Sequence, residues 1–216
     1  MKKSSAFLLI CLIVIADQAL KIYIKTHYFA GESHLVLGHW FQLYFIENEG
    51  MAYGWKFGGE IGKMGLTLFR LAAVIFGVFY IKKIIDQKYN RAFVVCVSLI
   101  FAGALGNLID SMFYGMIFSE SQTPFHLVHN NAIYYAKTVP WGTGYGNFLY
   151  GRVVDMLYFP IVQTRMPSWV PFIGGHNFTF FEPVFNIADA SISVGVLILV
   201  FFQKRLIHKK AVAVSQ

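Results

Sequence analysis

Four apolar stretches of about 20 residues constrain what this 216-residue chain can fold into. They lie at about 6–24, 65–81, 92–108 and 184–202. Each is about as long as a helix must be to cross the ~30 Å hydrocarbon core of a bilayer. The backbone has to satisfy its own hydrogen bonds there, so such stretches form helices. Only 13% of the residues are charged, about half the share in a soluble domain. The sequence therefore predicts a single-domain, all-α polytopic membrane protein with four transmembrane helices.

The distribution of lysine and arginine predicts the orientation of these helices. Ten of these residues lie on the N-terminus, the loop between the second and third stretches, and the C-terminal tail. The longer connections, about residues 25–64 and 111–183, carry only six. Because basic residues accumulate on the cytoplasmic side, we expect both termini in the cytoplasm and both long connections outside. Residues 35–47 alternate loosely and are rich in β-prone types, which predicts a small extracytoplasmic β-element on the membrane surface.

The sequence argues against a nucleic-acid site, a disulfide and a metal site. The net charge of +7 comes from basic residues placed between the apolar stretches, so no basic stripe exists for nucleic acid. Cys11 and Cys96 lie within apolar stretches and are expected to pack there without a disulfide. His126 and His129 resemble a metal-binding pair, but they lie in a loop-like segment with no evident third ligand. We expect no metal and no cofactor.

Polar side chains in the four apolar stretches predict a site. An ionisable group within a span is costly, so each is a candidate functional residue. With a rise of about 1.5 Å per residue, these groups all fall in the outer leaflet. They are Asp17, Lys21, Arg70, Asn107, Asp110, Asn186 and Asp189. Their common depth predicts a site that faces the extracytoplasmic side. A stabilising network between helices is an alternative role for Asp17, Lys21 and Asp110.

Paired carboxylates are the catalytic groups that the sequence offers, since it contains no G-x-S-x-G motif, P-loop or dinucleotide-binding fingerprint. Two neighbouring aspartates cannot both ionise easily, so one keeps a proton while the other acts as a base. The base can activate water, and the acid can polarise a peptide carbonyl and protonate the leaving nitrogen. A proton relay in a transporter would also use such carboxylates. Transporters usually contain internal repeats, and none is visible in this sequence.

Five motifs in order resemble those of the bacterial lipoprotein signal peptidases (signal peptidase II). They are Asp17-Gln18-x-x-Lys21, Asn48-Glu49-Gly50-Met51-Ala52-Tyr53-Gly54, Gly103-Ala104-Leu105-Gly106-Asn107-Leu108-Ile109-Asp110, Gly151-Arg152-Val153-Val154-Asp155-Met156 and Phe185-Asn186-Ile187-Ala188-Asp189. The resemblance covers most of the chain. It implies an intramembrane aspartyl endopeptidase of the bacterial cytoplasmic (inner) membrane. Its substrates would be prolipoproteins, cleaved before a diacylglyceryl-modified cysteine. We expect a monomer surrounded by membrane lipids.

The resemblance also implies the roles of individual residues. Asp155 and Asp189 are the implied catalytic pair. The implied substrate-binding or supporting residues are Asp17, Lys21, Asn48, Gly50, Tyr53, Asn107, Asp110, Arg152 and Asn186. Asp189 is also indicated by its depth in the membrane, whereas Asp155 lies in no apolar stretch and depends on the motif. Asp155 falls in a run, 151–160, that resembles a strand or short helix. Residues 50–54 are expected to form a flap over the substrate.

The chain departs from the family pattern in two places. The family usually has arginine directly after the aspartate of the third motif, where this chain has Ser111. We expect Arg152 to supply the missing guanidinium, with Arg70 as the second choice. A long insert at about 113–150 separates the third and fourth motifs. It is either an ordered lid or surface loop, or a decoration without a catalytic role. An inactive relative that only binds lipoproteins is a further alternative.

Overall fold

A computed structural model of the chain describes residues 1–49, 59–123, 135–165, 167–169, 175–180 and 183–206. The expected flap, with Gly50 and Tyr53, lies outside the described residues. The same is true of His126 and His129.

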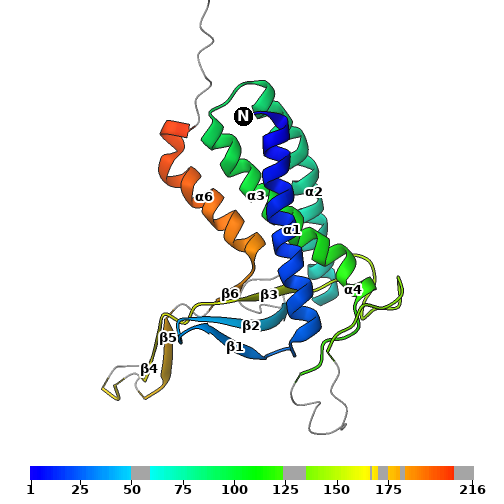
Figure 1. Cartoon of the computed structure of the whole chain (residues 1–216), viewed down its shortest axis with the longest axis vertical. Helices are drawn as coiled ribbons and strands as arrows, with labels where there is room; N and C mark the ends of the chain where they lie inside the picture. Colours follow the sequence, from blue (N-terminus) through cyan, green and yellow to red (C-terminus); the bar gives the residue numbers. More distant parts are fainter. Residues whose placement is uncertain (50–58, 124–134, 166, 170–174, 181–182, 207–216) are drawn as a thin grey trace, which may run out of the picture.

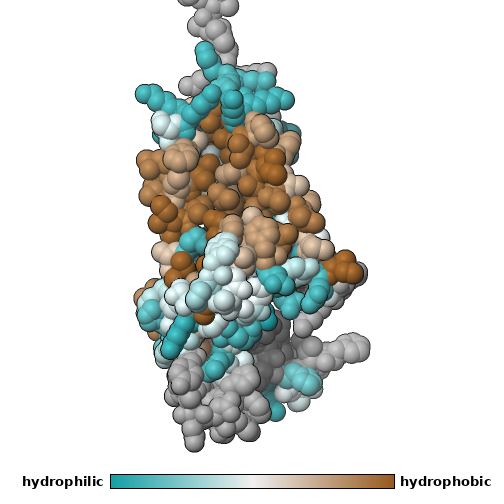
Figure 2. All heavy atoms as spheres, turned by 90° about the vertical axis from the view of Figure 1, so that its right-hand side faces the viewer, coloured by the Kyte–Doolittle hydropathy of each residue, from teal (hydrophilic) through white to brown (hydrophobic). Residues whose placement is uncertain are grey.

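Four long helices stand side by side in the upper part of the molecule (Figure 1). They are α1 (Lys3–His27), α2 (Gly59–Asp86), α3 (Arg91–Ile109) and α6 (Ile187–Leu206). All four are long and apolar enough to cross a membrane, which confirms the prediction of four such helices. Figure 2 shows a belt of hydrophobic side chains between more hydrophilic ends. The helix α6 begins later than its apolar stretch, because Val184–Phe185 form a short strand, β6.

The helix α3 does not end where its apolar stretch ends. It continues through a π-helical turn, η2 (Asp110–Tyr114), into α4 (Gly115–Ile117). A π-helical turn carries an extra residue per turn and is frequently found at functional sites. Here it contains Asp110 and Ser111, both buried.

A small antiparallel sheet lies across the lower ends of the helices (Figure 1). Its strand order is β1 (Ser33–Leu37), β2 (Phe41–Asn48), β3 (Val153–Tyr158) and β6. Strands β4 (Val162–Arg165) and β5 (Asn177–Phe180) form a separate hairpin. The strands β1 and β2 confirm the β-element expected near residues 35–47, and the run at 151–160 is a strand.

Strand β3 is the buried centre of this sheet. Val154 and Met156 are fully buried in a core with Ile24 of α1 and Phe45 of β2. Successive side chains of a strand point to opposite faces. Asp155, between these two apolar residues, is therefore directed to the other face and held by the core behind it.

The described parts of the insert pack against α4. The chain returns after residue 134, and Thr138 pairs with Phe118 in an isolated β-bridge. The Tyr145 amide donates to the Phe118 carbonyl, and the Gly146 amide donates to the Gly115 carbonyl. These backbone bonds fix the end of the insert to the segment around α4, and the strand that carries Asp155 follows it directly in the sequence.

Close contact between α3 and α6 depends on glycine. A β-carbon at Gly103 would lie 2.2 Å from the carbonyl oxygen of Ala188. One at Gly195 would lie 2.8 Å from the carbonyl oxygen of Cys96. Small residues allow helices in a membrane to approach this closely.

We expect Gly103→Ala to destabilise the fold by about 1–3 kcal/mol, because overpacking forces the helices apart. Thermal unfolding of the purified protein in detergent measures the effect. Gly65→Ala is the matched control: Gly65 is on a helix, and its added β-carbon would meet nothing within 4 Å. The explanation is wrong if the two variants unfold at the same temperature.

Candidate active site

The two candidate aspartates come from different kinds of structure. Asp155 lies on β3 and is only 4% exposed. Asp189 lies in the first turn of α6 and is partly buried. The sheet and the helix bundle therefore each contribute one carboxyl group.

Asn186 connects the two aspartates. Its Nδ2 donates to Asp155 Oδ1 over 2.7 Å, and its Oδ1 accepts the backbone N–H of Asp189 over 2.8 Å. In return, Asp189 Oδ2 accepts the backbone N–H of Asn186 over 3.4 Å. This reciprocal pattern is a capping box, in which the residue before a helix and the third residue within it satisfy each other's N–H groups. The three-residue spacing of Asn186 and Asp189 is thus explained by the start of α6.

Two further asparagines complete the contacts of the carboxyl groups. Asn107 Nδ2, from α3, donates to Asp189 Oδ1 over 2.7 Å. Asn48 Nδ2, at the end of β2, donates to Asp155 Oδ2 over 3.3 Å. Each candidate carboxyl group therefore accepts hydrogen bonds on both of its oxygens. The donors in these four bonds are uncharged amides.

The environment favours a proton on Asp155. Burial, and after it the charge of Asp189, raise the pKa of Asp155 to about 7. The amides of Asn48 and Asn186 and the charge of Lys21 act in the opposite direction. A carboxyl group with such a pKa is partly protonated at neutral pH. The pair can therefore offer one acid and one base at the same time.

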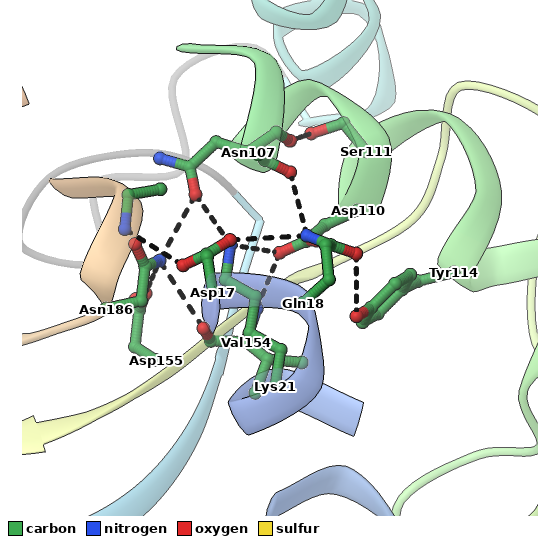
Figure 3. A network of polar contacts seen from close by, with 12 residues as sticks. Asp17, Gln18, Lys21, Asn107, Asp110, Ser111, Tyr114, Val154, Asp155 and Asn186 are labelled. Carbon is green, nitrogen blue, oxygen red and sulfur yellow. Dashed lines mark hydrogen bonds and ion pairs between the residues drawn. The ribbon is translucent and has the colours of Figure 1, made fainter. Parts of the chain in front are cut away.

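A buried ionic cluster of Asp17, Lys21 and Asp110 lies next to Asp155 and Asn186 (Figure 3). The Lys21 amine is 2.8 Å from Asp17 Oδ2 and 2.7 Å from Asp110 Oδ2. It also donates to Asn107 Oδ1 over 2.9 Å. All three charged side chains are at most 1% exposed. One amine thus holds two carboxylates and orients the asparagine that contacts Asp189.

The same cluster holds the backbone beside each candidate aspartate. Asp17 Oδ1 accepts the N–H of Ala188 over 2.9 Å, directly before Asp189. Asp110 Oδ2 accepts the N–H of Val154 over 3.4 Å, directly before Asp155. The cluster therefore is a network between helices that also positions both carboxyl groups.

Gln18 is a site residue that was not singled out from the sequence. Its Nε2 donates to Asp110 Oδ1 over 2.8 Å, and its Oε1 accepts from the Tyr114 hydroxyl over 3.1 Å. It thus connects the ionic cluster to the core. The one indication of its role in the sequence was its position in the first motif, directly after Asp17.

The structure corrects the expectation for Arg152. Arg152 pairs with Glu47, 3.0 Å away, and with Glu120 of the insert. Arg70 is the residue whose guanidinium reaches Ser111, with Nη1 3.0 Å from Oγ. The reason is that Arg152 lies between Glu47 of β2 and Glu120 of the insert and pairs with both carboxylates.

A second ionic cluster involving Arg152 was also missed from the sequence. Lys25, fully buried, contacts Glu47 and the Ser121 hydroxyl. Its amine lies 4.8 Å from the centre of the Tyr145 ring, which is also contacted by the guanidinium of Arg152. Ser121 and Tyr145 belong to the insert, so this cluster fastens the insert to the sheet. The available signal was a lysine one helical turn after Lys21.

Comparisons with known proteins agree with this architecture. The family model described as signal peptidase (SPase) II matches residues 9–204. A lipoprotein signal peptidase of Porphyromonas gingivalis is 44% identical over 200 residues, which cover 92% of this chain and 82% of that protein. A lipoprotein signal peptidase of Amoebophilus asiaticus is 35% identical over 201 residues, covering 92% and 77%.

Two solved structures, each described as a bacterial membrane enzyme, are also similar. One has a TM-score of 0.57 and 28% identity and covers 99% of this chain and 96% of its own. The other has a TM-score of 0.58 and 26% identity and covers 94% of each chain. With its four apolar helices, the chain is a multi-pass membrane protein. The match over nearly the whole length shows that it is a peptidase belonging to the signal peptidase II family.

Proposed function

We propose that this protein is an aspartyl endopeptidase that removes signal peptides by cutting prolipoproteins before a diacylglyceryl-modified cysteine. Its membership of the signal peptidase II family supports lipoprotein precursors as substrates. The observation that carries the aspartyl mechanism is the contact of Asn186 with both Asp155 and Asp189. Asn186 donates its side-chain amide to the Asp155 carboxyl group and its backbone N–H to the Asp189 carboxyl group, so one buried residue holds both.

In the proposed reaction, the ionised Asp189 takes a proton from a water molecule as its oxygen attacks the scissile carbonyl. Protonated Asp155 donates a hydrogen bond to the carbonyl oxygen, where negative charge develops. When the C–N bond breaks, a proton passes to the leaving nitrogen. Water is thus divided between the new carboxyl group and the new amine. Asn48 and Asn107 keep the two carboxyl groups in place throughout.

We further propose that the site opens to the extracytoplasmic side of the bacterial inner membrane, with both termini in the cytoplasm. The distribution of basic residues supports this orientation. On β1 and the turn after it, Leu35, Val36, Leu37 and Trp40 are all about half exposed. Such a surface is suited to the membrane interface. A substrate could then keep its acyl chains in the bilayer while its peptide reaches the pair. We propose that the enzyme acts as a monomer.

Asp155→Asn and Asp189→Asn should each lower kcat for a lipidated prolipoprotein by about 10²–10⁴-fold, the usual contribution of general acid or base catalysis. Cleavage by the purified proteins measures this. Asp86→Asn is the control, because Asp86 is half exposed and pairs with Lys3 on the surface. Robust turnover by either variant of the pair would rule out the assignment. Undiminished cleavage of the same precursor without its lipid would contradict the proposed substrate class.

The rate should depend on the protonation of Asp155. Its pKa is raised to about 7, and the proposed acid works only while it holds a proton. We therefore expect kcat to fall as the pH rises through about 7, with the pH profile of single-turnover cleavage as the measurement. A kcat that keeps increasing well above this pH would show that another group is the acid.

Lys21→Met should both destabilise the protein and abolish activity. It would leave Asp17 and Asp110 buried without their cation, which costs about 3–5 kcal/mol when one partner of a buried pair is removed. Thermal unfolding and cleavage are measured on the same preparation. Lys82→Met, at an exposed position of α2, is the control. If both variants unfold like the parent protein, the cluster contributes little to stability.

A further inference from the structure

Arg70 is a charged side chain on α2 that the mechanism above does not use. It is partly buried in a helix otherwise suited to hydrocarbon. A guanidinium in such a position is costly and marks a functional site when it faces other polar groups. Its Nη1 donates to Ser111 Oγ over 3.0 Å. Arg70 therefore points inward, toward the π-helical turn that follows α3.

Ser111 connects Arg70 to the active site through hydrogen bonds. It is 2% exposed, and its hydroxyl donates to the carbonyl of Asn107 over 2.9 Å. Asn107 in turn donates its side-chain amide to Asp189 over 2.7 Å. Three consecutive hydrogen bonds thus connect the guanidinium of α2 with the proposed catalytic base.

Without a further cation, the groups around the pair carry an excess of negative charge. Asp17, Asp110 and Lys21 together carry one net negative charge, and a singly protonated pair adds a second. Arg70 is a cation of α2 that reaches this part of the site through its hydrogen bond to Ser111. In a site of low dielectric constant, uncompensated negative charges raise the free energy of every carboxylate. Arg70 reduces the excess to one.

We propose that Arg70 is a positioning residue that orients Asp189 through Ser111 and Asn107 and stabilises its ionised form. The proposal rests on the aspartyl mechanism proposed above. It also gives Ser111 a purpose, because a small hydroxyl at this position lets a guanidinium approach from the neighbouring helix. Arg70 acts through Ser111 and Asn107, so we expect it to affect kcat more than KM.

The decisive variant is Arg70→Gln, tested by lipoprotein cleavage across a range of pH. We expect kcat to fall by about 10–100-fold, within the range found when one stabilising group is removed from an active site. Without the positive charge, both carboxyl groups should hold their protons to higher pH. The whole pH profile should therefore move to higher pH, while KM changes little. Arg91→Gln is the matched control, because Arg91 is exposed at the opposite end of α3.

Two rescue variants test whether the effect of Arg70 comes from its positive charge or only from the packing of its side chain. Arg70→Lys keeps the charge, so its pH profile should coincide with that of the parent protein even if its rate is lower. The double variant Arg70→Gln/Ser111→Arg returns a guanidinium from the neighbouring helix and should restore part of kcat and the original profile. Ser111→Ala keeps Arg70 but breaks the relay, so we expect a lower kcat and an unshifted profile.

Several outcomes would overturn the proposal. A folded Arg70→Gln protein with the parent profile, or a Ser111→Ala protein with the parent kcat, contradicts it. If Arg70→Gln does not fold, a shifted profile for Arg70→Lys contradicts it equally. Failure of the proposed function would look different, since Asp155→Asn or Asp189→Asn would then retain activity whatever Arg70 does.

Discussion

The Lys21 amine, buried between Asp17 and Asp110, is the interaction on which the rest of the site depends. Asp17 uses one oxygen for the amine and the other for the backbone N–H of Ala188. Asp110 uses Oδ2 for both the amine and the backbone N–H of Val154, while its Oδ1 accepts from Gln18. The amine thus couples α1, the end of α3, the start of α6 and strand β3. A buried ion pair contributes to stability only when its remaining polar atoms are satisfied, and here those atoms bind the elements that carry the pair.

In this arrangement the buried cation and the two candidate catalytic carboxyl groups have different direct partners. The hydrogen bonds described above for Asp155 and Asp189 come from asparagine amides and a backbone N–H. An amide orients a carboxyl group without neutralising it as a direct cation would. The cation of the cluster is instead occupied by Asp17 and Asp110. One candidate acid can therefore keep a raised pKa although a lysine lies close by.

The insert is tied to the site by the second cluster. Lys25 follows Lys21 by one helical turn, and its partner Glu47 directly precedes Asn48. Arg152 joins the same cluster three residues before Asp155. Contacts to Ser121 and Tyr145 bring the insert into this arrangement. The described parts of the insert therefore contribute to holding β2 and β3, the strands that carry Asn48 and Asp155.

The sequence alone predicts the four helices, a common membrane depth for the polar groups and Asp189 as a candidate catalytic residue. Helical periodicity and apolar length are local properties, so they can be read without knowing the fold. The motif spacing of Asn186 and Asp189 is local too, because a capping box needs only the first turn of a helix. Asp155 was identified only through the resemblance to the family, since nothing in its own segment marks a buried carboxyl group.

Only the tertiary structure decided which distant groups meet. Asp155 reaches Asn186 because β3 pairs with β2 on one side and β6 on the other. The choice between Arg152 and Arg70 at Ser111 was wrong from sequence, because it depends on which helix packs beside the π-helical turn. The two carboxylates that hold Arg152 are 32 and 105 residues away along the chain. Contacts between such remote residues are set by packing, and no local pattern encodes them.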